Sequence, residues 1–166
     1  PLRRQRQMCI RDRLPNAMIG EIQVNQADSK FEMNQIISKG LSGDIKPSDI
    51  QESKERIASL SETNDSLIEQ YKATEQTKEE SGLVEAFESS NSDYREYREE
   101  IFSFLEQGDY EGATRTNEEA ASKRQESEEI LSELKQLNGE LGKQLKEKSD
   151  AYASRGRTIA LSTAVA

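Results

Sequence analysis

Apolar residues recur at spacings of three and four along most of the chain, a pattern that predicts amphipathic helices. The pattern is interrupted at three places, which are Leu41 to Pro47, Ser81-Gly82 and Gln107-Gly108-Asp109. These turns divide the chain into four predicted helices, at about 16–40, 49–78, 82–107 and 110–157. Because heptad seams joined by short turns are typical of bundles, we predict an all-α, antiparallel, up-down-up-down four-helix bundle.

The turns carry residues that suit helix ends. Ser48, followed three residues later by Gln51, predicts a capping box at the start of the second helix. Gly108 suits the left-handed position that ends the third helix, and Asp109 suits the N-cap of the fourth. Tyr94 and Tyr97 carry much of the aromatic mass of the third helix, and we expect them to fill the core with their hydroxyls at the bundle edge.

The fourth helix is predicted to be nearly twice as long as the others. At ~1.5 Å per residue, an unbroken helix from Tyr110 to the end of the chain would be on the order of 85 Å long. Its lower apolar positions, Leu137, Leu141 and Leu145, lie beyond the reach of the third helix. The missing start of helix one or a second subunit would supply their partners, and we expect a homodimer packed along helices one and four.

The last residues, 158–166, are apolar and follow a helix that sheds its charges near Arg157. A membrane span needs about twenty residues, so we interpret this run as the truncated start of a membrane helix, with the natural protein continuing beyond Ala166. Residues 14–157 would then form the soluble bundle.

Residues 1–13 differ from the rest of the chain. They carry five arginines and one aspartate, whereas the whole chain of 166 residues has a net charge of -9. We interpret them as an artefactual or non-native leader and exclude them from the bundle. The alternative is a basic cytoplasmic flank that precedes a membrane span. The acidic body predicts no nucleic-acid partner.

Composition also limits the possible chemistry. The chain has no histidine and a single cysteine, Cys9, so histidine-based catalysis, cysteine–histidine pairs and thiolate metal sites are excluded. Its many carboxylates are expected to be solvated, and no phosphate-binding glycine loop is present. We therefore expect no enzyme, no cofactor and no metal site.

A candidate ligand site follows from a change in the seams of helices one and four, where polar residues replace apolar ones. Counting from the distal turn places these positions level in an antiparallel pair. A buried polar layer that contains one cation could hold a small anion. The alternative is that the same residues face solvent or set the register of a dimer. The candidate residues are Asn25, Ser29, Thr116, Lys123 and Ser127.

The junction of helices three and four carries a resemblance to a known family. Two tyrosines, an aliphatic residue, a Gly-Asp turn and an alanine follow one another as Tyr94-Arg-Glu-Tyr97-Arg98, Ile101, Gln107-Gly108-Asp109-Tyr110 and Ala113. This order resembles the ligand-binding four-helix bundle of bacterial methyl-accepting chemotaxis proteins. Leu14-Pro15 with Ile22 is similar to the middle of that family's first helix, and 158–166 is similar to the start of its second membrane span.

The resemblance implies the sensor domain of a transmembrane chemoreceptor, lying outside the cytoplasmic membrane. It implies that ligand or partner binding is passed through the fourth helix to cytoplasmic signalling modules in chemotaxis. Helix-one arginines bind the ligand carboxylate in such receptors, but helix one has none here after Arg13, only Lys30 and Lys39. No binding residue is therefore carried over. Similar bundles occur on histidine kinases and diguanylate cyclases, and a membrane-anchored structural coiled coil is a further alternative.

Overall fold

The computed structural model describes the backbone of residues 2–163 and the side chains of residues 14–153. This part of the chain is helical apart from short connections, with no strand. The helices are α1 (Leu2–Ser42), α2 (Pro47–Lys72), α3 (Lys78–Gln107), α4 (Tyr110–Glu119) and α5 (Ala121–Thr163).

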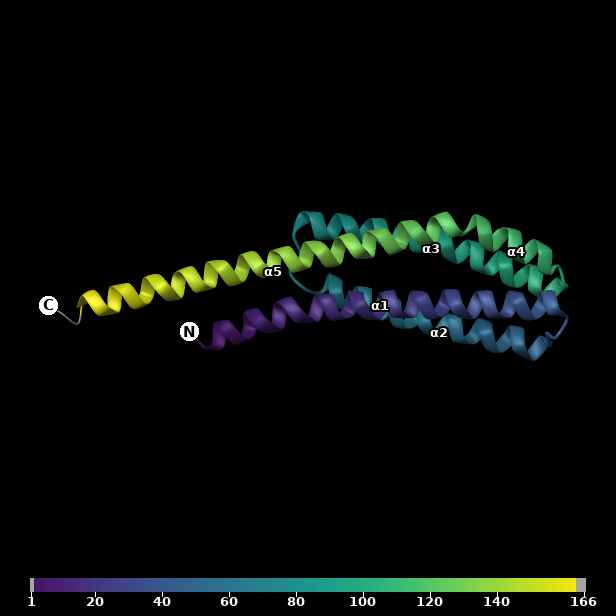
Figure 1. Cartoon of the computed structure of the whole chain (residues 1–166), viewed down its shortest axis with the longest axis horizontal. Helices are drawn as coiled ribbons and strands as arrows, with labels where there is room; N and C mark the ends of the chain where they lie inside the picture. The colour runs from purple at the N-terminus through teal and green to yellow at the C-terminus, as the bar shows by residue number, and fades with distance from the viewer. Residues whose placement is uncertain (1, 164–166) are drawn as a thin grey trace.

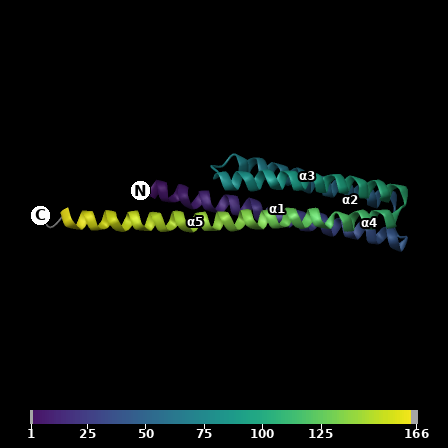
Figure 2. The same cartoon turned by 90° about the horizontal axis from the view of Figure 1, so that it is seen from above.

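The helices form four antiparallel rods, because α4 and α5 follow one another along the fourth rod (Figure 1). The connections α1–α2 and α3–α4 lie together at one end, which we call the closed end. The α2–α3 connection lies at the other, the open end, where α5 continues beyond its neighbours (Figures 1 and 2). Each rod packs on its two sequence neighbours, and α1 also packs on α5, so the predicted up-down-up-down bundle is confirmed.

The second and third helices begin at other residues than the sequence predicted. The capping box expected at Ser48 is wrong, because α2 starts at Pro47 and the Lys46 amide donates to Asp49 Oδ2 (3.0 Å). Proline suits this first helical position, since it has no N–H to leave unpaired. The α2–α3 turn is not Ser81-Gly82: α2 ends at Lys72 and α3 starts at Lys78. Thr77 caps α3 through a reciprocal pair of hydrogen bonds with Glu80, which places Ser81-Gly82 inside the helix.

The predicted end of the third helix is confirmed. Gly108 closes α3 in the left-handed conformation with φ 77°. Asp109 then caps α4, since its Oδ1 accepts the Gly112 amide at 2.8 Å.

The fourth rod is not the unbroken helix that we predicted, because it is interrupted at Ala120. At this break, Arg124 Nη2 donates to the backbone carbonyl of Asn117 (3.1 Å), and Nη1 donates to the Asn117 side chain (2.7 Å). In a regular helix that carbonyl serves the amide four residues on, so the guanidinium competes for a helix acceptor. A side chain that inserts into the hydrogen-bond ladder is a recognised cause of such breaks.

The start of the first helix differs from expectation. The first helix begins at Leu2 rather than near Asn16, because the arginines, glutamines and leucine of this segment favour helix although they lack periodicity. The side chains of residues 2–13 lie outside the described residues, and the interpretation of this segment as a leader stays a prediction.

At the other end, residues 158–163 continue α5, while 164–166 lie outside the described residues. Among the helices that the structure describes, none is long and apolar enough to cross a membrane.

Candidate functional site: a polar layer inside the bundle

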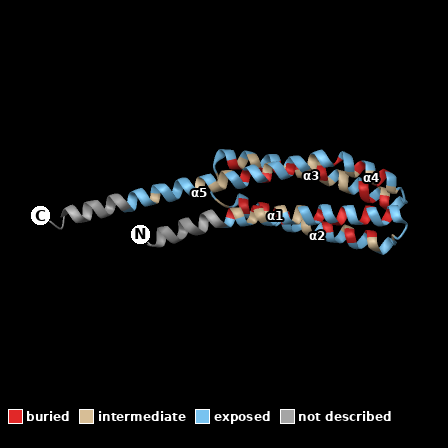
Figure 3. Cartoon of the chain, viewed as in Figure 1, coloured by how far each residue is buried: buried red, intermediate tan, exposed pale blue. Residues whose placement is uncertain are grey.

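The apolar core is divided into two clusters along the bundle axis. The closed-end cluster consists of Met33, Ile36, Ile37, Ile50, Ile57, Ile101, Phe102, Leu105 and Ala113. The open-end cluster consists of Ile19, Ile22, Ile68, Tyr71, Val84, Phe87, Leu131 and Leu134. Buried positions continue between the two (Figure 3), but polar residues occupy them, including Ser29, Asn64, Ser90 and Ser127. We call this middle level the polar layer.

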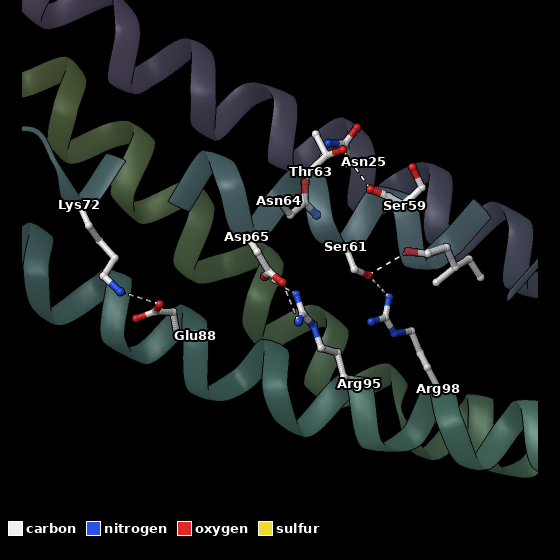
Figure 4. Close-up of polar contacts among 11 residues, drawn as sticks. Asn25, Ser59, Ser61, Thr63, Asn64, Asp65, Lys72, Glu88, Arg95 and Arg98 are labelled. Carbon is white, nitrogen blue, oxygen red and sulfur yellow. Dashed lines mark hydrogen bonds and ion pairs between the residues drawn. The ribbon is translucent and has the colours of Figure 1, made fainter. Parts of the chain in front are cut away.

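On the α1–α2 side, the layer is closed by an amide pair. Asn25 Nδ2 of α1 donates to Asn64 Oδ1 of α2 at 2.8 Å, and Asn64 is 7% exposed. These two residues are labelled in Figure 4, beside the contacts between α2 and α3. A hydrogen bond between buried polar groups fixes the pairing of two helices, because leaving either partner alone would be costly.

On the α3–α5 side, a hydrogen bond between two serines pairs the helices. Ser127, which is 1% exposed, donates to Ser90 Oγ at 3.2 Å, and the Ser90 hydroxyl donates to the backbone carbonyl of Lys123 (3.2 Å). Small side chains at this level let α3 and α5 approach closely.

Tyr94 lies between two guanidinium groups. The carbon Cζ of Arg98 lies 5.3 Å from the centre of its ring, and Cζ of Arg124 lies 5.5 Å from it. Both distances allow an attractive cation–π interaction. The tyrosine is 6% exposed, and its hydroxyl is buried without a hydrogen-bond partner. The expectation that this hydroxyl would lie at the bundle edge is therefore wrong.

Arg98 brings a positive charge into the layer without a carboxylate partner among the described residues. Its Nη1 donates to Ser61 Oγ of α2 (2.9 Å), while its Nε is buried and makes no hydrogen bond. Burial lowers the pKa of the Arg98 guanidinium, because the charged form loses its hydration. Arginine nevertheless stays charged at neutral pH.

Ion pairs hold α2 and α3 together around this level (Figure 4). Arg95 forms a two-pronged contact with Asp65, and Lys72 Nζ lies 3.0 Å from a Glu88 carboxylate oxygen. These pairs lie near the surface, so solvent and salt screen them and their contribution to stability is small.

Besides Arg98 Nε, three polar atoms of the layer are left without partners. They are Gln26 Oε1 and Ser29 Oγ on α1 and the Tyr94 hydroxyl on α3. Buried polar atoms in proteins are almost always bonded, to water where no protein group is available. The layer thus offers free donors and acceptors to a water or a small polar ligand.

A surface hollow lies between α1 and α5 beside this layer. It has a volume of about 640 Å³, and Lys30 and Arg124 are among its lining residues. The same Arg124 contacts Tyr94 and the carbonyl at the helix break, so it links the hollow to the interior.

The five predicted site residues all lie at or near the layer, but they do not form one cluster. Asn25 bonds to α2, whereas Ser127 bonds to α3. Lys123 forms ion pairs with Asp93 of α3 (3.0 Å) and Glu126 (3.1 Å), which raise its pKa. Ser29 and Thr116 are buried.

The prediction that Asn25 and Lys123 lie at the same height along the bundle is wrong. Near the closed end, Asn34 bonds to Asn117, although Asn34 lies six residues before Gly40 and Asn117 lies nine residues after Gly108. Further down, Gln23 bonds to Ser132 and Lys135, and Lys30 pairs with Glu128, so Asn25 lies opposite residues beyond Lys123. Between these contacts the fourth rod, which is interrupted at Ala120, advances 15 residues from Asn117 to Ser132, while α1 advances 11 from Gln23 to Asn34.

Sequence reasoning missed Arg98, Arg124 and the role of Tyr94. Arginines on polar helices are usually solvated, so their identity alone gave no signal. The spacing of four between Tyr94 and Arg98 does place both on one helix face, and this was the only available indication.

Comparison with known proteins agrees with this architecture. Searches of curated proteins and of solved structures gave no match. A family model described as a four helix bundle sensory module for signal transduction matches residues 9–153, which is most of the chain. The resemblance inferred from the junction of α3 and α4 is thereby confirmed, and the chain belongs to this family of four-helix-bundle sensory modules.

Proposed function

We propose that this sensory module is the extracytoplasmic sensor domain of a transmembrane chemoreceptor and that α5 carries its signal towards the membrane. The observation that supports this most is the family match over residues 9–153, combined with a last helix that continues beyond α2 and α3. Past the α2–α3 connection, only α1 runs beside α5 (Figure 1), residues 143–148 are exposed, and Tyr152 is 74% exposed.

The polar layer supplies a physical basis for movement of α5. A signalling element needs two packings of similar energy. Interdigitated apolar side chains oppose sliding, whereas the layer between the two apolar clusters contains small serines and unpartnered polar atoms. A ligand or partner that binds at this level, by way of the hollow beside Arg124, changes which packing of α5 is favoured.

We also propose that the domain is a homodimer, with α1 at its centre. The outer face of α1 carries a second repeat of three and four that contains no charged residue. It consists of Ala17, Gly20, Val24, Ala27, Phe31, Asn34, Ser38 and Leu41. We call it the outer seam. Val24, Phe31 and Leu41 are 59%, 67% and 56% exposed.

A second copy of α1 fits the outer seam best, because an uncharged seam meets itself across a two-fold axis without repulsion. In a chain in which 33% of residues are charged, an apolar stripe of this length is otherwise a liability. The hollow beside Arg124 adjoins α1, so the partner subunit would lie close to it.

The output is proposed to be chemotaxis. A histidine kinase or a diguanylate cyclase could use the same input, and a membrane-anchored structural bundle would transmit nothing. The proposal includes no catalysis by this domain.

A chimera tests whether α5 transmits a signal. The chain is joined through α5 to the membrane helix and cytoplasmic half of a characterised chemoreceptor, and one, two, three, four or seven alanines are inserted after Lys146. We expect the activity of the kinase that the chemoreceptor controls to vary with the number of alanines inserted. It should return to the level without insertion when seven residues, about two helical turns, are added. The control is the same set of insertions after Asp44 in the α1–α2 connection. Unchanged activity in all α5 variants would favour a passive spacer.

A further inference from the structure

A second pocket lies at the open end, away from the polar layer. It has a volume of about 390 Å³ and is formed where the α2–α3 connection and the start of α3 face α5. This volume is within the range of small-molecule sites in proteins. We call it the open-end pocket.

One wall of the open-end pocket is apolar. Leu141 and Leu145 of α5 and Pro15 of α1 contribute to it, and Gly142 adds no side chain. Leu141 is half-buried and Leu145 is 39% exposed, because α5 continues here beyond the end of α2 and the start of α3. The wall can therefore still bury the hydrocarbon part of a ligand.

The opposite side holds a buried carboxylate. Glu80 is 5% exposed, and its two oxygens accept hydrogen bonds from the Tyr71 hydroxyl (3.2 Å) and the Thr77 amide (2.6 Å). The amides at the start of α3 stabilise the negative charge locally. No lysine or arginine of the described residues forms an ion pair with it, so the charge has no counter-ion.

The polar groups beside Glu80 are oriented as acceptors. Asn138 Nδ2 donates to the Tyr71 hydroxyl (2.8 Å) and to the Leu134 carbonyl (2.9 Å). With its donors engaged, Asn138 presents its Oδ1 as an acceptor. A ligand that binds here needs hydrogen-bond donors and a positive charge, together with an apolar body for the leucine wall.

We propose that the open-end pocket binds a small organic ammonium ion with an aromatic or branched apolar body. The ammonium group lies against Glu80 and Asn138, and the body lies against Leu141 and Leu145. Lys148 also lines the pocket, but its side chain is exposed, whereas the Glu80 carboxylate is buried in the pocket wall.

A ligand in this pocket would contact both the start of α3 and the emerging part of α5. Its role as a signal would rest on the sensor function proposed above. Binding of the ligand does not depend on the sensor function, so a binding measurement can fail or succeed independently of signal transmission.

The test is calorimetric titration of the full chain at pH 7 with phenethylammonium chloride. Uncharged 2-phenylethanol and anionic 3-phenylpropionate, which have similar bodies, are the comparison ligands. We expect saturable binding of the ammonium ion only. Equal binding of the alcohol would overturn the charge argument, and preferential binding of the anion or no binding at millimolar concentration would overturn the proposal.

Variants locate the binding site. Glu80→Gln removes the charge but retains a residue type that completes a capping box, so it should fold and weaken binding at least tenfold. Glu79→Gln removes an exposed carboxylate from the same helical turn and should leave affinity unchanged. Leu145→Ser, at a partly exposed position, should weaken binding without loss of helicity by circular dichroism. Unchanged affinity in both Glu80→Gln and Leu145→Ser would contradict the assignment.

Discussion

Gly40 of α1 lies directly against the ring of Tyr110 at the closed end, and a Cβ added to this glycine would overlap the ring. The contact joins the last turn of the first rod to the first turn of the fourth. It explains why a glycine is used inside a helix, where it is otherwise unfavourable.

Gly40→Ala should therefore destabilise the bundle, although alanine is the better helix former. Overpacking of this kind costs about 1–3 kcal/mol. Urea unfolding followed by circular dichroism measures the change. The matched control is Gly139→Ala, because a Cβ at Gly139 meets nothing within 4 Å. The control should gain up to about 1 kcal/mol from helix propensity. Equal changes in the free energy of unfolding for the two substitutions would contradict the argument that the Tyr110 ring leaves no room for a Cβ at position 40.

The serine pair of the polar layer predicts non-additive mutations. Ser90→Ala alone should cost about 1 kcal/mol, since it leaves the buried Ser127 hydroxyl without its acceptor. Ser127→Ala should cost less, because the Ser90 hydroxyl keeps its bond to the Lys123 carbonyl. The double variant should cost less than the sum of the two, because no orphaned hydroxyl of the pair remains. A double-mutant cycle by urea unfolding measures this coupling. Additive costs would mean that the two hydroxyls do not interact in solution.

Tyr71 predicts a loss of stability at alkaline pH. Burial raises the pKa of Tyr71 above its ordinary value, so the folded protein keeps this proton when the unfolded chain has released it. Above pH about 10, the unfolded state binds fewer protons and stability falls as pH rises. The Tyr71→Phe variant lacks this contribution.

At pH 8, Tyr71→Phe should be less stable than the native chain by about 1–2 kcal/mol, because Glu80 and Asn138 lose a hydrogen-bond partner. Between pH 9 and 11 the difference should shrink. Urea unfolding at several pH values measures it. A difference that stays constant would show that Tyr71 ionises alike in both states.

The outer seam of α1 predicts a dimer that a single charge disrupts. Val24→Lys places two like charges across the proposed two-fold axis, so sedimentation equilibrium should show a weaker dimer or a monomer. Glu62→Lys, at an exposed position of α2, is the control and should leave the association unchanged. A native chain that stays monomeric at high micromolar concentration would argue against the homodimer.

Much of the fold could be predicted from hydrophobic spacing and turn residues. The four rods and the Gly108-Asp109 turn follow from local chemistry that the structure preserves. The start of α3 was missed because Ser81-Gly82 is a strong turn signal, whereas the Thr77–Glu80 capping box that overrides it lies four residues upstream.

The polar layer was predicted in outline and misplaced in detail. Its existence follows from gaps in the seams, but the level of Asn25 relative to Lys123 depends on how the fourth rod bends. At the break in this rod, Arg124 competes for the Asn117 carbonyl, a local contact between polar residues that the spacing of apolar residues does not indicate. The position of Arg98 against Tyr94 depends in the same way on which faces of α2 and α3 meet.

The most direct test of the sensor proposal is to lock α1 to α5 in the chimera described above. Gln23 and Ser132 are in contact across these helices, so Gln23→Cys with Ser132→Cys can be joined by a short bis-maleimide in a Cys9→Ser background. Joining Asp65→Cys to Arg95→Cys across α2 and α3 is the control. If movement of α5 against α1 carries the signal, only the first cross-link shifts kinase activity to a fixed level. Kinase activity unchanged by the α1–α5 cross-link would contradict transmission through α5.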